Sequence, residues 1–206
     1  MRLGFLRVLG TDIVHSLASY YSAQYPNAAF SFSSGRTADL LARLESSQLD
    51  IVFAPAGRIG EEYSAAELFS LPLSTAVSAT HPLAAQSKVS MKELARYPFL
   101  QYTEGAGLRD IIEKAFEEAG VKPYIAYESE EAPVLAGLAA RNFGAAIVLK
   151  SEIPQLDGLK MLDIEPGISF PISAIISTQH TMGPTALAFL DYVKTAIKTV
   201  SKKNTI

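Results

Sequence analysis

The 206-residue sequence contains no cysteine and no long uninterrupted stretch of apolar residues. The absence of cysteine excludes disulfide bonds, zinc–thiolate sites and thiol nucleophiles, and it fits a reducing compartment. A membrane span would need about 18 consecutive apolar residues, and no such run occurs. The segment Met1–Val8 is too short for the apolar region of a signal peptide and lacks a small-residue cleavage site. We therefore predict a cytoplasmic protein with no membrane partner.

Histidine is scarce, and the short motifs of common enzymes are missing. The three histidines are His15, His81 and His180, and none is spaced for an HExxH metal site. The GxSxG motif, the P-loop and the dinucleotide-binding fingerprint do not occur either. A Ser-His-Asp triad assembled from distant positions stays open as an alternative without positive support. The sequence thus predicts no catalytic residues, no metal and no cofactor, in a protein that is not an enzyme.

The charge of the chain is nearly balanced, with 18 Lys and Arg against 21 Asp and Glu. The basic residues are scattered, apart from the pair Lys202-Lys203. A nucleic-acid-binding surface normally shows a basic stripe. We expect that this chain does not bind DNA by itself.

The first 54 residues alternate between strand-like and helix-like patterns with short connections. The expected elements are a strand at Leu3–Val8, a helix from about Asp12 to Gln24, a strand around Phe30–Phe32, a helix capped by Thr37 and a strand at Asp50–Ala54. Two such βαβ units in succession indicate a parallel sheet covered by helices.

A second βαβ set begins near residue 75. Its expected elements are a capping box at Ser90–Glu93, strands at Phe99–Tyr102, Tyr124–Glu128 and Ala145–Leu149, a helix at Leu108–Ala119 that Gly120 ends, and a helix near Pro133–Arg141. Strands at Leu159–Ile164 and Phe170–Ser177 follow, and a helix with Pro184 in its first turn closes the chain.

The predicted fold class is α/β, with two Rossmann-like lobes whose mostly parallel sheets are joined by two hinge strands. Lobe I takes residues 1–74 and 174–206, and lobe II takes residues 75–173. Ligands of parallel α/β sheets bind beyond the carboxyl ends of the strands, where helix N-termini favour anions. We therefore expect a ligand cleft between the lobes, lined by the turns that follow these strands.

The candidate binding residues lie in those turns. They are Gly10, Thr11, Asp12, Gly35, Arg36, Thr37, Ala54, Pro55, Tyr102, Thr103, Glu104 and Glu128. Thr11 and Thr37 serve equally well as helix caps, and caps are roughly twice as common as ligand contacts at such positions. The Arg36 guanidinium suits a carboxylate, although a solvated arginine fits the sequence as well. Gly105-Ala106-Gly107 could cradle an anion or only form a turn.

Two acidic residues narrow the ligand class. Asp12 and Glu104 would place negative charge near the same cleft, opposite Arg36. A zwitterionic ligand, such as an amino acid, would satisfy both charges. The alternative is that these carboxylates only compensate helix dipoles. The pattern predicts a small anionic or zwitterionic metabolite as ligand.

The order of several stretches resembles the effector-binding domain of LysR-type transcriptional regulators, which has the type 2 periplasmic-binding-protein fold. The stretches are "LGFLRVLGTDIVHSLASYYSAQYPNAAFSF", "GRTADLLARLESSQLDIVFA", "SATHPLA", "MKELARYPFL", "TEGAGLRDIIEKAFEEAGVKP" and "LAGLAARNFGAAIVL". The chain departs from the family at His15, Asn142 and Leu149, and Leu9 stands where a polar residue is usual. Asn142 can keep its turn because asparagine tolerates left-handed backbone.

This resemblance implies a sensor that controls transcription through an N-terminal helix-turn-helix, which has no counterpart here, so that Met1 would begin a truncated chain. DNA would be bound only through that missing domain. The resemblance also implies a homodimer or homotetramer that pairs Ile13–Gln24 with Leu108–Ala119, where Tyr20, Tyr21 or Tyr25 could make contacts if they do not belong to the core. A stand-alone solute-binding protein of the same fold is the alternative.

Overall fold

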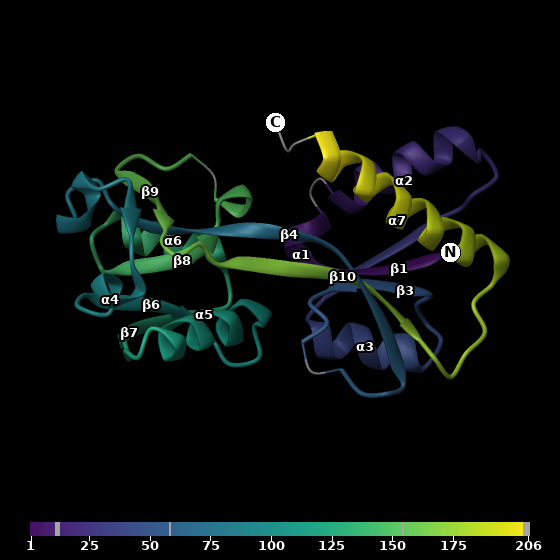
Figure 1. Cartoon of the computed structure of the whole chain (residues 1–206), viewed down its shortest axis with the longest axis horizontal. Helices are drawn as coiled ribbons and strands as arrows, with labels where there is room; N and C mark the ends of the chain where they lie inside the picture. The colour runs from purple at the N-terminus through teal and green to yellow at the C-terminus, as the bar shows by residue number, and fades with distance from the viewer. Residues whose placement is uncertain (11–12, 58, 154, 204–206) are drawn as a thin grey trace. The chain divides into compact units, whose positions relative to one another are not determined.

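The computed structural model describes residues 1–10, 13–57, 59–153 and 155–203 (Figure 1). The chain forms two compact units, which we call unit 1 (Met1–Ser70 with Pro171–Ile206) and unit 2 (Leu71–Phe170). Both boundaries fall inside long strands, β4 (Tyr63–Ser78) and β10 (Ser169–Ser177). The sequence-based boundaries, 74/75 and 173/174, fall inside the same two strands.

Unit 1 is a sheet with helices on both faces. Strand β1 (Arg2–Leu6) lies parallel to β2 (Ser31–Gly35) and to β3 (Ile51–Ala54), and β10 pairs antiparallel with β3. Helix α2 (Ile13–Gln24) packs with α7 (Pro184–Lys203) on one face, and α3 (Thr37–Glu45) covers the other (Figure 1). The chain runs from β1 through α2 to β2 and then back past β1 through α3 to β3, and right-handed crossovers in these opposite directions place the two helices on opposite faces.

The first strand is shorter than the sequence predicts. It ends at Leu6, and Arg7–Gly10 form a helical turn, α1. Leu9 is fully buried within that turn. A short apolar run does not distinguish a strand from a buried helical turn, which is why the prediction extended the strand to Val8. The predicted end of this strand, Val8, was therefore wrong.

Unit 2 is built on three parallel strands in the order β8-β6-β7. These are β8 (Ala145–Leu149), β6 (Pro98–Tyr102) and β7 (Tyr124–Ser129). Strand β4 pairs antiparallel with β8 and β9 (Leu159–Ile164), and β5 (Lys88–Val89) pairs parallel with β9. The helical segments are η1 (Pro82–Ala85), α4 (Met91–Leu94), α5 (Gly107–Glu118), α6 (Ala132–Ala140) and η2 (Lys150–Glu152). Right-handed crossovers place α5 and α6 on opposite faces of this sheet.

The predicted helix ends of unit 2 are confirmed. The Ser90 hydroxyl and the Glu93 carboxylate form a reciprocal capping box at the start of α4. Gly120 follows the cap of α5 with φ +69°, and its N–H donates to the Glu117 carbonyl at 2.9 Å. Asn142 adopts φ +63° after α6, the left-handed conformation that its sequence allows.

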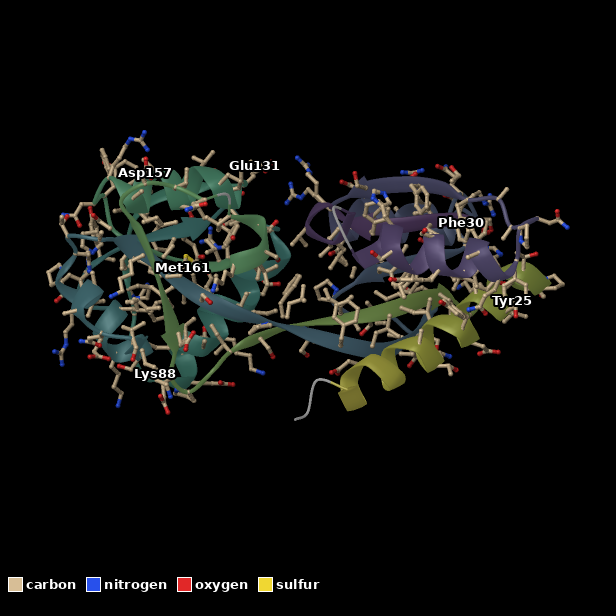
Figure 2. All side chains as sticks on the ribbon, turned by 90° about the horizontal axis from the view of Figure 1, so that it is seen from above. Tyr25, Phe30, Lys88, Glu131, Asp157 and Met161 are labelled. Atoms are coloured by element: carbon tan, nitrogen blue, oxygen red, sulfur yellow. The ribbon has the colours of Figure 1, made fainter. Side chains whose placement is uncertain are left out.

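The core of unit 1 contains an aromatic cluster between α2, α7 and the strand β2. The ring of Tyr21 lies 5.1 Å from that of Phe189, which is 5.4 Å from Phe30. Tyr21 is 2% exposed, so it belongs to the core and is excluded as a dimer-contact candidate. Tyr20 and Tyr25 are exposed, and Figure 2 labels Tyr25 and Phe30 at this end of the unit.

Gly144 lies where the backbone of β8 begins beside the start of β6. A Cβ at this position would lie 2.4 Å from the carbonyl oxygen of Pro98, which as a backbone atom cannot move freely. We expect Gly144→Ala to lower the free energy of unfolding by about 1–3 kcal/mol in urea denaturation. Gly137→Ala is the matched control, because its Cβ would meet nothing closer than 3.8 Å inside α6. Equal stability of the two variants would contradict this close approach.

Candidate functional site

The candidate residues of the first turn fall partly outside the described chain. Gly10 is the last residue of α1, and Thr11 and Asp12 lie outside the described residues. The following candidates, Gly35 and Arg36, connect β2 to α3. Gly35 is half-buried at the end of its strand, and Arg36 is exposed.

Arg36, and not Thr37, is the N-cap of α3. Its backbone is extended, with φ −77° and ψ 152°, and its carbonyl accepts the first helical hydrogen bond from Leu40 at 3.0 Å. Thr37 is the first helical residue, and no side chain caps this helix. The prediction that Thr37 caps the helix was wrong, because the helix begins one residue earlier than expected. The exposed Arg36 side chain is therefore attached to the backbone at the N-terminal end of α3.

Ala54 and Pro55 follow β3. Ala54 is fully buried, pairs with Ser173 of β10 and belongs to the apolar cluster formed with Leu40 and Val52. Pro55 is half-buried. The Ala54 methyl group is therefore used for packing. Ala54 and Pro55 can contact a ligand through their backbone atoms.

The end of β6 carries buried polar atoms that lack hydrogen-bond partners. Tyr102 is 3% exposed and Gln101 is 0% exposed. Among the described residues, no partner reaches the Tyr102 hydroxyl, the Gln101 side-chain nitrogen or the Thr103 hydroxyl. The Thr75 hydroxyl, on β4, is buried in the same way. Burying a polar group without a hydrogen bond is costly, so such a group needs an explanation.

Arg109, on α5, holds the end of β6 to β7. Its guanidinium donates to the backbone carbonyl of Tyr102 at 2.9 Å and to the carboxylate of Glu113 at 2.7 Å. It also pairs with Glu128, a candidate binding residue. The Glu128 carboxylate is thus engaged within the protein, and the Arg109 side chain, 13% exposed, fixes the backbone beneath Tyr102.

The loop after Tyr102 forms a turn. Gly105 adopts φ +78°, the Ala106 N–H donates to the Thr103 carbonyl at 3.3 Å, and Gly107 starts α5. The Gly105-Ala106-Gly107 stretch therefore has the turn-forming role that the sequence left open. Glu104, at the top of this turn, is exposed.

Two acidic residues that the sequence-based search did not single out lie at the same edge of the sheet. Glu131, which is labelled in Figure 2, is the N-cap of α6, just beyond β7. Glu152 ends η2, just beyond β8. Burial and the nearby charge of Glu131 raise the pKa of Glu152 to about 7. Burial and the Glu152 carboxylate raise the pKa of the Tyr102 hydroxyl. Glu152 therefore feels the charge of Glu131 and itself acts on the Tyr102 hydroxyl, and we call these three residues the acidic cluster.

Glu131 and Glu152 are absent from the sequence-based candidates, although they obey the rule that ligands bind beyond the carboxyl ends of parallel strands. They lie two and three residues beyond the strands β7 and β8, which is further than the predicted turns reach. Arg109 gave no such signal because it lies inside a helix, and only the fold brings it to Glu128.

Other polar groups have structural roles. His81 is buried, accepts from the Leu83 N–H at 3.1 Å and packs on Tyr97, and burial lowers its pKa.

Within the described residues, no group of three or more His, Cys, Asp or Glu is placed to hold a metal ion. None of the described helices has the length and apolar character to cross a membrane.

The chain belongs to the LysR substrate-binding domain family, whose model matches residues 1–198. It is 33% identical over 157 residues to the uncharacterized HTH-type transcriptional regulator YybE of Bacillus subtilis (strain 168), an alignment that covers 76% of this chain and 52% of that protein. It is 21% identical to the transcriptional dual regulator GltC of the same organism, over 94% of this chain and 66% of that protein. The chain thus spans about half to two thirds of the length of these relatives.

Solved structures confirm the fold. The effector-binding domain of QuiR in complex with shikimate has a TM-score of 0.86, with 24% identity and 97% of each chain covered. The BenM effector-binding domain with its effector benzoate has a TM-score of 0.85, with 18% identity over 98% of this chain and 93% of that one. The predicted fold class, with two lobes of the type 2 periplasmic-binding-protein kind, is confirmed, and the chain is an effector-binding domain of the LysR type.

Proposed function

We propose that this domain binds a small anionic or zwitterionic effector at the carboxyl edge of the unit 2 sheet. The observation that carries this proposal is the pair of buried hydroxyls on Tyr102 and Thr103, neither of which has a partner among the described residues. A ligand that hydrogen-bonds both hydroxyls would remove their desolvation cost, and that gain would be realised only on binding. The protein therefore keeps hydrogen-bonding capacity for a molecule that arrives from solvent.

The backbone around these hydroxyls supports this use. Arg109 holds the Tyr102 carbonyl, and the Thr103 N–H donates to the Ser129 carbonyl at 3.2 Å. The two side chains are therefore presented from a fixed segment between β6 and β7. A preorganised site loses little conformational entropy when a ligand binds.

The test of this site is Thr103→Val, which replaces the hydroxyl by a methyl group of similar size. Effectors would first be found by thermal shift of the wild-type chain against small carboxylic acids and amino acids. We expect the variant to bind the effector about 5- to 10-fold more weakly in calorimetric titration, with the unfolding temperature of the free protein maintained. Unchanged affinity would remove Thr103 from the site.

Arg36 tests whether unit 1 contributes to binding, since the cleft between the lobes stays a prediction. If its guanidinium holds a ligand carboxylate, Arg36→Ala will weaken binding by about 1.5–3 kcal/mol. Because Arg36 is exposed, the melting temperature of the free variant is expected to stay close to that of the wild type. Equal affinity of variant and wild type would assign binding to unit 2 without Arg36.

We further propose that the whole protein is a cytoplasmic transcription regulator that carries a DNA-binding helix-turn-helix. This proposal is supported by the matched relatives, which are HTH-type and other transcriptional regulators and are longer than this chain. The effector would shift an equilibrium between two arrangements of the regulator, which requires that it bind one arrangement more tightly. DNA binding would belong to the additional domain, and a homodimer or homotetramer would use the exposed Tyr20 and Tyr25.

Functions other than effector sensing are less well supported. A stand-alone solute-binding protein of the same fold is not favoured, because the chain belongs to a family of regulator domains. We also propose that the domain has no catalytic activity of its own, since the polar groups at the edge of β6 suit binding and the family is a regulator family.

A further inference from the structure

The effector site proposed above contains an acidic cluster formed by three adjacent strand ends. Tyr102 is the last residue of β6, Glu131 comes two residues after the end of β7, and Glu152 comes three residues after the end of β8. The three strands are parallel, so their carboxyl ends meet at one edge of the sheet.

Two basic residues lie near this edge: Lys150 starts η2 and is exposed, and Arg109 is directed to the other face of the sheet. In the β6–β7 ladder, Gln101 pairs with Glu128 and Tyr102 pairs with Ser129. Because side chains alternate between faces, Glu128 lies on the opposite face from Tyr102. Arg109 pairs with Glu128 and Glu113, so its charge is already neutralised there. The charge that acts on the Tyr102 hydroxyl is instead the carboxylate of Glu152.

The Glu152 carboxylate lacks an ion-pair partner within the described part of the chain. Among the described residues no Lys, Arg or His forms an ion pair with it, and the charges that act on it and on its neighbour Tyr102 come from carboxylates. Its partial burial together with the charge of Glu131 makes ionisation costly, as the raised pKa near 7 shows. A cation bound beside Glu152 would stabilise the ionised carboxylate against both its burial and the charge of Glu131.

The buried hydroxyl of Tyr102 has no hydrogen-bond partner among the described residues. This side chain is 3% exposed, and burial together with the Glu152 carboxylate raises the pKa of its hydroxyl. A phenolic oxygen and a carboxylate both accept hydrogen bonds, and an ammonium group offers three donors with a positive charge. A second carboxylate of a ligand would instead add a third negative charge.

We propose that the effector carries an ammonium group, which binds Glu152 and the Tyr102 hydroxyl at the carboxyl edge of the unit 2 sheet. This inference rests on the proposed function and narrows it, because it selects amino-group-containing molecules over purely anionic ones. Thr103 would remain available for an acceptor elsewhere on the same ligand, since no described residue is a partner of its hydroxyl.

The test compares ligands that differ only in this group. The whole chain is screened by thermal shift and then titrated with amino acids and amino sugars, each beside the 2-hydroxy acid or parent sugar of the same skeleton. We expect at least one amine to bind, with its hydroxyl counterpart bound about 10- to 100-fold more weakly. Glu152→Gln should remove most of this preference, whereas Glu117→Gln, an exposed carboxylate on α5, should keep it.

The pH dependence gives a second readout of the same contact. The amine should bind more tightly above pH 7 than below it, because the ionised form of Glu152 attracts it, and this gain should disappear in Glu152→Gln. Glu131, whose charge acts on Glu152, Tyr102, on which Glu152 acts, and Lys150 at the start of η2 are the same in both proteins.

Three results would overturn the ammonium contact: no amine binds, the hydroxyl counterparts bind as tightly as the amines, or the preference survives Glu152→Gln. Binding of hydroxy acids that weakens in Thr103→Val would overturn the ammonium contact and leave the proposed site standing. Binding that changes in neither Thr103→Val nor Tyr102→Phe would overturn the proposed site as well.

Discussion

Glu152→Gln is expected to stabilise the free protein above pH 7 and to leave its stability unchanged below pH 4.5. The ordinary carboxyl pKa of 4.5 rises to about 7 in the folded chain. Between these values the folded state binds more protons than the unfolded state, so the free energy of unfolding falls as the pH rises through this window. At about 1.4 kcal/mol per pKa unit, the loss reaches up to about 3 kcal/mol above pH 7. Glutamine does not ionise, and the variant escapes this loss.

Urea denaturation of both proteins at a series of pH values measures this effect. The difference in the free energy of unfolding should grow from near zero at pH 4.5 to its full value above pH 7. Glu117→Gln serves as the control, because Glu117 is exposed on α5. A constant difference across the whole pH range would show that Glu152 titrates normally, and the acidic cluster would lose its basis.

Tyr102→Phe is expected to separate stability from binding. The buried hydroxyl has no hydrogen-bond partner among the described residues, so removing it should raise the free energy of unfolding by about 1–2 kcal/mol. The same change should weaken effector binding by about tenfold, because the hydroxyl is there for the ligand. Loss of binding together with a gain in stability is typical of functional residues.

Denaturant unfolding of the free chain and calorimetric titration of the effector check the two parts separately. Tyr124→Phe is the matched control, since Tyr124 is 71% exposed at the start of β7 and should change neither quantity. A less stable Tyr102→Phe variant would mean that the hydroxyl has a partner inside the protein. Unchanged affinity would place the effector elsewhere.

Local sequence signals predicted most elements of the fold because the physics behind them is local. The capping box at Ser90 depends on residues three positions apart, and the end of α5 at Gly120 depends on one residue that favours positive φ. The strand at Ala145–Leu149 was predicted with its observed bounds, because a fully buried strand is a continuous apolar run.

The errors arose where tertiary packing decides between two local options. Leu9 is apolar in a strand or in a helical turn, and its burial in unit 1 selects the turn. Thr37 is a good cap in isolation, but α3 starts one residue earlier, so Arg36 takes that place. A shift of one residue lies below what sequence patterns resolve.

The candidate site likewise contains residues that a local sequence rule predicts and residues that only the fold brings together. The rule that ligands lie beyond the carboxyl ends of strands pointed to Tyr102 and Thr103, whose buried hydroxyls have no hydrogen-bond partner in the described residue ranges. The raised pKa of Glu152 could not be read from the sequence, since it depends on burial and on the charge of Glu131 more than 20 positions away. The engagement of Glu128 by Arg109 is likewise a product of the fold.

The most direct measurement is the crystal structure of this chain bound to the effector that the thermal-shift screen identifies. The account predicts ligand polar atoms within about 3.2 Å of both the Tyr102 and the Thr103 hydroxyl, at the carboxyl edge of the unit 2 sheet. A ligand bound elsewhere, with neither hydroxyl in contact with it, would contradict the proposed site.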